Sequence, residues 1–404
     1  MIASPILITT TLLAPLLLGL AAVAASEQPQ PLPTVQERGG LPHVFAKLNA
    51  GKPVTVAYFG GSITAGAGAS HAEQTSYRGL VGQWFTTTFP QSAVTHLNAA
   101  IGGTGSDLGA FRLGRDMLAR HPDLVFVEFA VNDGSSEESM IDRAMEGIVR
   151  QIRRHDPATD ICFVYTFVVG QRAEVVGTGL TRAMRRDEAV AAHYDIPSVN
   201  MALPAARRLA GGTLTEAEFS KDGVHPTDAG YKVYADTLIA FLESQRTRRT
   251  AALRPHPLPA PLRSDSLEHA QMISPAQMAP YGAGWTTDTH NPTGSFPELL
   301  VSDTPGATQT VAFSGPILAL FYVLGPDTGA FDYQIDGGEW KILDPFDSFA
   351  KGYARSHYRL LADGLADTGH TLTLKVRAEH NPDSKGTWTR IGYLLTNPSS
   401  AKKR

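Results

Sequence analysis

The sequence predicts an α/β fold, a three-layer α/β/α sandwich with a parallel central sheet, followed by a C-terminal all-β domain. Between residues 40 and 245, apolar runs at 54–59, 124–131 and 162–169 have the composition of strands buried on both faces of a parallel sheet. Weaker candidate strands occur at 93–100 and 196–201. Amphipathic stretches separate the runs, so strands and helices alternate along this part of the chain.

Two of the amphipathic stretches have apolar side chains at helical spacing. They recur at positions 140, 144, 148 and 152 in one stretch, and at 231, 234, 238 and 241 in the other. Helices of this kind cover the faces of a parallel sheet, because each must bury its apolar stripe.

The pattern changes after residue 245. Residues 246–264 are basic and then proline-rich, which predicts a linker or a strap that crosses a domain surface. From 265 to 398, short apolar runs alternate with Gly, Pro, Asp and Asn turns, which predicts a jelly-roll-like β-sandwich accessory domain. Its Trp285, Trp340 and Trp388 could stack on sugars, although aromatic side chains in sandwiches more often belong to the core.

The first 25 residues carry no charged side chain and end in small residues before Ser26. This composition predicts a signal peptide at 1–25, a linker at 26–39 and a secreted or periplasmic protein. The segment also lacks the usual Lys or Arg near its start, and its apolar run approaches the ~20 residues that span a bilayer. An uncleaved N-terminal membrane anchor is therefore the alternative.

The formal net charge is only −4 over 404 residues. A balance so close to neutral gives no reason to expect nucleic acid or an anionic membrane surface as a partner.

A serine stands where the first strong strand candidate ends. Gly60 and Gly61 precede Ser62, and two glycines let the backbone turn sharply. A hydroxyl placed there would lie at the carboxyl edge of the sheet, where open α/β folds bind ligands. The alternative is an ordinary glycine-rich turn with a capping serine.

Two more motifs follow predicted strands. Gly102 and Gly103 come after the candidate strand at 93–100 and could offer a backbone N–H to a substrate oxygen, or form a flexible turn. Asn132 follows the most apolar strand and could donate its amide to an oxyanion, or cap a helix with Asp133.

The fourth motif is an acid three residues before a histidine, Asp222 and His225, just ahead of a predicted helix. A carboxylate at this spacing can fix the imidazole tautomer while the other ring nitrogen acts as a base. A metal site is the rival interpretation, but there is no second His or Cys at ligand spacing nearby. We therefore expect no metal and no cofactor.

Taken in order, the four motifs resemble the four blocks of the SGNH (GDSL-like) hydrolase superfamily, over roughly residues 50–242. The resemblance implies an SGNH, flavodoxin-like fold with Ser62 as nucleophile, His225 as general base and acid, and Asp222 orienting the histidine. It also implies an oxyanion hole formed by the Ser62 and Gly103 N–H groups and the Asn132 side chain.

The chain departs from the family pattern at two positions. The first block reads Gly-Gly-Ser-Ile-Thr where many members have Gly-Asp-Ser-Leu, so the acid before Ser62 is absent. The third block has Ala130 where a glycine is common. Neither change removes a catalytic group, but both alter the surroundings of the substrate.

The resemblance implies a serine esterase that acts by two-step acyl transfer. The loop between Ile63 and Tyr77 is rich in small residues and contains no long apolar lid, so we expect short acyl groups such as acetyl on a carbohydrate. The alternatives are an O-acyltransferase acting on a polysaccharide, a lipase or thioesterase, and a non-catalytic binding protein. The complete set of five site residues argues against the last.

Overall fold

A six-stranded sheet forms the centre of the α/β domain. The computed structural model describes residues 1–2, 33–248, 253–290 and 292–399. The strands of this sheet lie in the order β1-β6-β5-β4-β2-β3. Their bounds are β1 (Val35–Gln36), β2 (Val54–Gly60), β3 (Val94–Asn98), β4 (Leu124–Glu128), β5 (Asp160–Tyr165) and β6 (Ser198–Asn200). Strands β2 to β6 pair in parallel, which confirms the predicted parallel sheet.

The segment expected to be a linker at 26–39 contributes to this sheet. Val35 and Gln36 form β1, which pairs antiparallel with β6 at the sheet edge. Arg38 then donates to the Ile196 carbonyl oxygen at 2.8 Å and to Ser198 Oγ at 3.2 Å. The linker expectation was therefore wrong for residues 35–38, because their backbone and side-chain donors complete the edge of the sheet.

The predicted signal peptide, or membrane anchor, lies almost wholly outside the described residues. Of these residues the structure describes only the first two. Among the helices of the described residues, none is both long and apolar enough to cross a membrane.

Two strands are shorter than the apolar runs that predicted them. Strand β4 ends at Glu128, although Phe129 and Ala130 beyond it are each only 1% exposed. Strand β5 covers 160–165 rather than 162–169. The residues after these strand ends are still apolar and buried although the chain has left the sheet. Composition alone therefore does not show where each strand ends.

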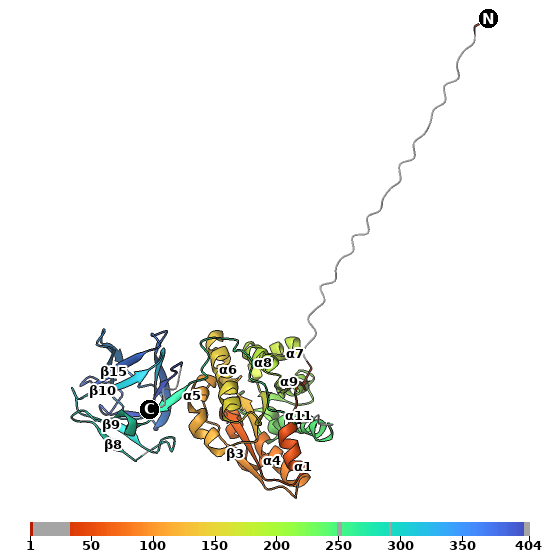
Figure 1. The fold of residues 1–404 in the computed structure, drawn as a ribbon, viewed down its shortest axis with the longest axis horizontal. Helices are drawn as coiled ribbons and strands as arrows, with labels where there is room; N and C mark the ends of the chain where they lie inside the picture. Colours follow the sequence, from red (N-terminus) through yellow and green to blue (C-terminus); the bar gives the residue numbers. More distant parts are fainter. Residues whose placement is uncertain (3–32, 249–252, 291, 400–404) are drawn as a thin grey trace. The chain divides into compact units, whose positions relative to one another are not determined.

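Helices connect the strands and cover both faces of the sheet, as predicted. Helices α5, α6 and α8 pack in one row, and α1, α4 and α11 in a second (Figure 1). The α-helices are α1 (Pro42–Asn49), α2 (Ser62–Ala65), α3 (Ala72–Thr75), α4 (Tyr77–Thr88), α5 (Ser106–Asp116), α6 (Glu138–His155), α7 (Arg172–Thr178), α8 (Arg182–His193), α9 (Ala202–Ala210), α10 (Glu216–Phe219) and α11 (Asp228–Thr247). Short 3₁₀ helices are η1 (Leu118–Arg120), η2 (Asn132–Ser135), η3 (Val169–Gln171) and η4 (Pro275–Met278).

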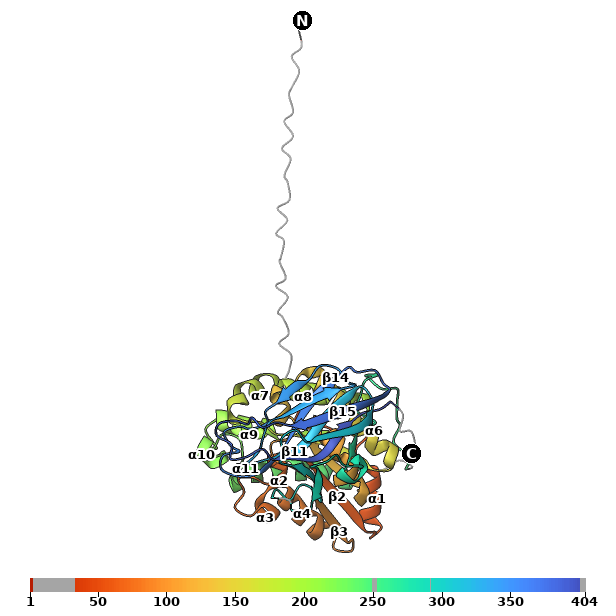
Figure 2. The ribbon, with the colours of Figure 1, turned by 90° about the vertical axis from the view of Figure 1, so that its left-hand side faces the viewer.

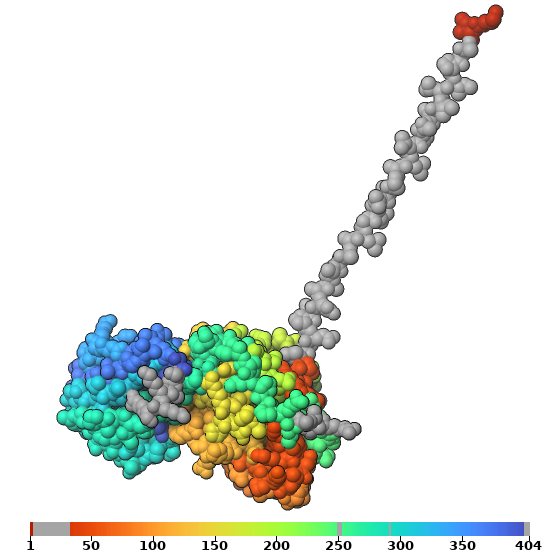
Figure 3. Space-filling view, in the orientation of Figure 1, coloured from red at the N-terminus to blue at the C-terminus, as the bar shows by residue number. Residues whose placement is uncertain are grey.

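Residues 253–263, which we call the strap, run along the α/β domain as irregular chain. The Leu262 N–H donates to Glu146 of α6 at 2.5 Å, and Arg150 of α6 donates to the Pro259 carbonyl oxygen at 2.8 Å. Figure 3 shows green chain from this region lying against the yellow chain of α6. Side chains of α6 thus satisfy backbone groups that irregular chain would otherwise leave unpaired.

The C-terminal domain consists of two antiparallel sheets, which confirms the all-β prediction (Figure 2). One sheet has the order β10-β15-β12-β13, and the other β14-β11-β16-β9-β8 with β7 also paired to β16. The strands are β7 (Gln271–Ile273), β8 (Thr286–Asp288), β9 (Leu299–Ser302), β10 (Thr308–Ser314), β11 (Ile317–Leu324), β12 (Phe331–Ile335), β13 (Lys341–Leu343), β14 (Arg355–Asp363), β15 (Gly369–Val376) and β16 (Thr389–Thr396).

Strand β11 is buried on both of its faces. Side chains of one face enter the core between the two antiparallel sheets: Leu318, Leu320, Tyr322 and Leu324. Those of the other face belong to the same hydrophobic cluster as the core of the α/β domain: Ile317, Ala319, Phe321 and Val323. Because successive residues of a strand point to opposite sides, this one strand joins the two cores.

The three tryptophans of the β domain have different surroundings. Trp285 is buried in the sandwich core, as aromatic side chains in sandwiches usually are. Trp388 is half-buried beneath the guanidinium of Arg390, 5.0 Å from the ring centroid. Trp340 is exposed, with the Lys375 ammonium 4.5 Å from its ring centroid.

Candidate active site

Ser62 stands at a corner where strand β2 meets helix α2. Gly61 is extended and Ser62 is the first residue of the helix. A Cβ on Gly60 would lie 2.4 Å from the Glu128 carbonyl oxygen, and a Cβ on Gly61 would lie 2.1 Å from Asn132 Oδ1. Both distances are impossible for a real side chain, so the two glycines are required by the close approach of β4 and its following turn. The space that an aspartate at position 61 would need is occupied by Asn132.

The structure brings Ser62, His225 and Asp222 into one chain of hydrogen bonds. Ser62 Oγ lies 2.9 Å from His225 Nε2, and His225 Nδ1 lies 2.7 Å from Asp222 Oδ2. The Asp222 carboxylate can only accept, so the Nδ1–H donates to it and Nε2 faces the hydroxyl with its lone pair. In this tautomer the imidazole can remove the serine proton when the oxygen attacks an electrophile.

Local hydrogen bonds hold the Asp222 carboxylate in its ionised form. Besides the imidazole, it accepts the His225 N–H at 2.8 Å, the Val224 N–H at 2.9 Å and the Ser220 hydroxyl at 3.1 Å. The imidazole first, and then these backbone donors, hold the pKa of Asp222 well below its usual range. The side chain is 54% exposed, so this hydrogen-bonded cluster stands at the rim of the protein and not in a closed pocket.

The loop that carries His225 is packed against the chain that follows Ser62. A Cβ on Gly68 would lie 2.9 Å from His225 Cβ and 2.6 Å from the Pro226 carbonyl oxygen. Gly68 also has a positive φ of 88°, which glycine adopts without strain. This contact helps to fix the distance between Ser62 and His225, which are 163 residues apart in sequence.

The other two predicted site residues come from neighbouring strand ends. A Cβ on Gly102 would lie 3.4 Å from Ser62 Cβ, and the next residue, Gly103, has a positive φ of 71° with open space where its Cβ would stand. Asn132 begins η2 after strand β4 and contacts Gly61. The segments carrying Ser62, Gly103 and Asn132 therefore meet around the Ser62 corner, at the point where the strand order reverses between β2 and β4.

A buried arginine, whose function the sequence did not reveal, connects two of these segments. Arg112 of α5 is fully buried and donates to the Ala99 carbonyl oxygen at 2.5 Å and to the Gly60 carbonyl oxygen at 3.2 Å. It also forms an ion pair with Asp116 at 3.1 Å. Burial lowers the pKa of Arg112 to about 10, so the guanidinium remains charged at neutral pH. Because Gly60 and Ala99 precede the Ser62 corner and the Gly102 loop, Arg112 fixes their separation from behind.

A buried carboxyl group supports the Ser62 corner from below. Glu128, at the end of β4, accepts the Thr64 hydroxyl at 3.2 Å and the Thr166 hydroxyl at 2.7 Å. Burial raises the pKa of Glu128 to about 7, although both hydroxyl hydrogen bonds act to lower it. Asp133 is buried likewise, and desolvation raises its pKa to about 7 while it accepts the Ser106 N–H at 2.9 Å.

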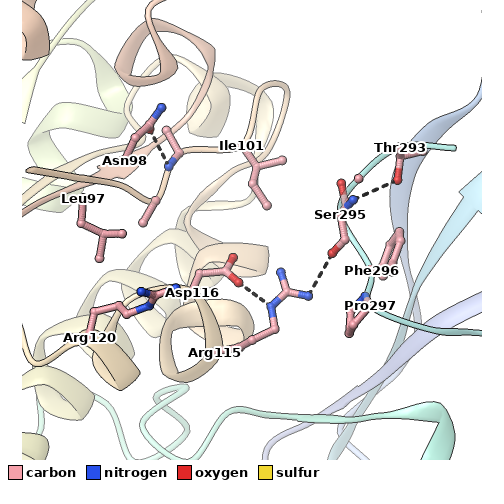
Figure 4. A pocket seen from close by; sticks show the side chains of 13 residues that line it. Leu97, Asn98, Ile101, Arg115, Asp116, Arg120, Thr293, Ser295, Phe296 and Pro297 are labelled. Carbon is pink, nitrogen blue, oxygen red and sulfur yellow. Dashed lines mark hydrogen bonds and ion pairs between the residues drawn. The ribbon is translucent and has the colours of Figure 1, made fainter. Parts of the chain in front are cut away.

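A cleft of about 650 Å³ lies beside this site, between the α/β domain and a loop of the β domain (Figure 4). Arg115 donates across it to the Ser295 carbonyl oxygen at 3.2 Å. Ser62 and His225 do not line the cleft, but Ile101 does, and the chain continues from Ile101 directly into Gly102. The lining residues are Leu97, Asn98, Ala99, Ala100, Ile101, Arg115, Asp116, Arg120, Thr293, Gly294, Ser295, Phe296 and Pro297.

The fold and a family match together indicate a serine carboxylic ester hydrolase of the SGNH class. Residues 58–233 match the model of the GDSL-like Lipase/Acylhydrolase family, and this part of the chain is a GDSL-like hydrolase domain. A comparison with curated proteins gives no match.

Two solved structures are similar to both domains together. They are crystal structures of a two-domain esterase (CEX) active on acetylated mannans, one of them co-crystallised with mannopentaose. The TM-score is 0.80 for the structure without the sugar and 0.79 for the structure with it. In both comparisons the match covers 91% of this chain and 98% of the esterase chain, at 24% sequence identity. The similarity shows that the order and fold of the two domains are shared.

Replacing Arg112 by lysine should lower kcat for a small ester by ~10–10²-fold with a much smaller change in KM. Lysine keeps the charge but cannot donate to two carbonyl oxygens in the planar geometry of a guanidinium, so the Gly60 and Ala99 segments lose their common anchor. Steady-state kinetics below the melting temperature of both proteins measures the effect. A lower melting temperature with unchanged kcat would show that Arg112 stabilises the fold without positioning the site.

As the pH rises from about 4.5 to 7, the free energy of unfolding of the wild type should fall relative to that of the Glu128→Gln variant. In the unfolded chain Glu128 ionises near its ordinary pKa, whereas the folded protein keeps its proton up to about pH 7. The unfolded state therefore loses a proton first, and wild-type unfolding free energy falls over this interval by up to about 3 kcal/mol. Glutamine does not titrate. Urea unfolding at pH 5 and pH 8 checks this, and an equal difference at both pH values would contradict it.

Proposed function

We propose that this protein removes acetyl or similar short acyl groups from a polysaccharide, with Ser62, His225 and Asp222 as its catalytic triad. The single observation that carries the proposal is the continuous hydrogen-bond chain from the Ser62 hydroxyl through both ring nitrogens of His225 to Asp222, at 2.9 and 2.7 Å. The family match over residues 58–233 supports ester hydrolysis as the reaction that these three side chains catalyse.

In the first half of the reaction, Ser62 Oγ attacks the ester carbonyl carbon while His225 Nε2 accepts the hydroxyl proton. The tetrahedral intermediate then collapses, and His225 returns the proton to the departing sugar oxygen. In the second half, water attacks the acyl-serine, His225 takes the water proton, and the acid leaves as Ser62 recovers its hydrogen. Asp222 stays ionised throughout and stabilises the imidazolium.

The negative charge on the carbonyl oxygen needs donors that are in place before the reaction. We assign them to the Ser62 and Gly103 N–H groups and the Asn132 side chain. Support comes from the contacts of Gly102 with Ser62 and of Asn132 with Gly61, which place both segments against the serine. The N–H of Ser62 belongs to the first turn of α2, where no intrahelical acceptor is available to it.

Three observations support a short acyl group on a carbohydrate. The chain from Gly66 to Ser70 is built of small residues and packs on His225 through Gly68, so it provides no apolar lid for a long acyl chain. The adjacent cleft offers polar groups, among them Asn98, Arg115 and Arg120, to a sugar chain. The two-domain esterase with this fold is described as active on acetylated mannans.

We further propose that the protein is exported. The uncharged, apolar first 25 residues followed by small residues support a signal peptide, with an N-terminal anchor as the second possibility. Either placement would give the enzyme access to polysaccharide outside the cytoplasm.

Replacing Ser62 by alanine should lower the turnover of p-nitrophenyl acetate by ~10⁴–10⁶-fold, because no other group can form the acyl intermediate. The change removes one hydroxyl at a helix start, so the melting temperature should stay close to that of the wild type. The matched control is Ser264→Ala, which removes an exposed hydroxyl just beyond the strap and should leave turnover unchanged. Full activity of the Ser62→Ala protein would disprove the assignment.

The wild-type enzyme should hydrolyse p-nitrophenyl acetate with a kcat/KM ~10-fold or more above that for the octanoate. It should also release acetate from an acetylated mannan, whereas the Ser62→Ala protein should not. A preference for octanoate would favour a lipase or thioesterase. Good turnover of the small acetate without release from any acetylated polysaccharide would limit the proposal to a short-chain esterase.

A further inference from the structure

Three potential metal ligands meet at the edge of the sheet opposite to Ser62. His43 lies on α1, Asp160 is the first residue of β5, and His256 lies on the strap. One ring nitrogen of each histidine and one oxygen of Asp160 all lie within 4.8 Å of one another. Within the described residues this is the one group of three or more His, Cys, Asp or Glu side chains with such spacing. Because the strands are parallel, the start of β5 is remote from the strand ends that carry Ser62.

The carboxylate of the cluster is held in a fixed orientation. Asp160 is fully buried, and one of its oxygens accepts the Val44 N–H at 2.8 Å. Its other oxygen lies 2.7 Å from His256 Nε2. The backbone hydrogen bond thus directs one oxygen away, and the second oxygen faces the imidazole.

The first histidine has its proton fixed by the protein. His43 Nε2 lies 2.9 Å from the Arg254 carbonyl oxygen, which can only accept. The Nε2 proton is therefore engaged, and the Nδ1 lone pair of the neutral ring is unprotonated. A backbone carbonyl that takes the second N–H is the usual surrounding of a metal-bound histidine. The two imidazole rings stand edge to face with centroids 5.0 Å apart.

We infer that His43, Asp160 and His256 bind a divalent transition-metal ion of the Zn²⁺ type, with water completing the coordination. Two imidazoles and one carboxylate are ligands that Zn²⁺ takes in a four-coordinate site with one open position. On binding, the His256 proton moves from Nε2 to Nδ1, so that the Nε2 lone pair can bind the metal. The Asp160 oxygen that accepts this proton's hydrogen bond then binds the metal instead.

Such an ion would fasten the strap to the α/β domain. His43 and Asp160 belong to the domain, while His256 belongs to the segment that leads to the β domain, and its N–H already bonds the Pro157 carbonyl oxygen at 2.8 Å. An ion that binds only the folded arrangement stabilises it by mass action. The effect is on stability, because the site is remote from the Ser62 corner.

The test uses the full chain without an affinity tag, dialysed against EDTA and then titrated with zinc chloride alone. Calorimetry should find one tightly bound Zn²⁺ per chain, and saturating zinc should raise the melting temperature by about 2–4 °C. The His43→Gln and His256→Gln variants should each bind zinc at least ~10-fold more weakly. Their melting temperatures in EDTA, compared with that of the wild type, verify that they fold.

A second histidine pair provides the matched control. The exposed His121 and His155 face each other at 3.2 Å and could bind zinc weakly without a carboxylate. The His155→Gln variant should keep the tight site and the melting-temperature rise. Loss of zinc binding in this variant would overturn the inference, as would equal zinc affinity of His43→Gln and wild type. Both outcomes are independent of esterase activity, which EDTA should leave unchanged below the melting temperature.

Discussion

The close approach of the strand ends around Ser62 is the constraint on which the site depends. The side-chain oxygen of Asn132 occupies the place where a side chain on Gly61 would stand. The carbonyl oxygen of Glu128 likewise occupies the place of a side chain on Gly60. The Gly60 carbonyl oxygen in turn accepts the Ile101 N–H at 3.0 Å as well as the Arg112 guanidinium. The Gly60 segment is therefore spaced from the Glu128 and Ile101 segments by backbone contacts, which have fewer freely rotating bonds than contacts between long side chains. The short Asn132 side chain and the buried Arg112 add further contacts. Segments held in this way need not reorganise when charge develops beside them.

The acidic groups near the site divide into two kinds by their surroundings. Asp222 stands at the rim and accepts hydrogen bonds from one imidazole, two backbone N–H groups and one hydroxyl, so it stays ionised. Glu128 and Asp133 are buried beneath the same corner with fewer donors, and burial raises the pKa of each to about 7. The ionised carboxylate that contacts His225 is thus kept near water, whereas the two buried carboxyl groups that hold the scaffold can be neutral. Because burial raises these two pKa values, the free energy of unfolding falls as the pH rises toward 7. The same two groups make the hydrogen bonds that support the Ser62 corner.

The sequence predicted the parts of the site that depend on short-range pattern. Asp222 and His225 are three residues apart, so their hydrogen bond forms within one loop, and Ser62 follows a strand that its apolar run identifies. The contribution of Arg112 could not be read in this way, because its acceptors on Gly60 and Ala99 become neighbours only when β2 pairs with β3. For the same reason the sequence did not reveal that Val35 and Gln36 extend the sheet. Pairing between segments distant in sequence is determined by tertiary packing, on which local composition carries little information.

The β domain is held to the α/β domain by more than the strap that connects them. Strand β11 gives one face to the sandwich core and the other to the cluster that includes the α/β core, so its eight residues are all buried. On the α/β side, Arg143 of α6 donates to both oxygens of Asp363, at 2.6 and 3.1 Å. A strand with two apolar faces would leave one of them in water if the domains separated. The cleft that borders the Gly102 loop is closed on one side by a β-domain loop, so its shape depends on the packing that holds the β domain in place.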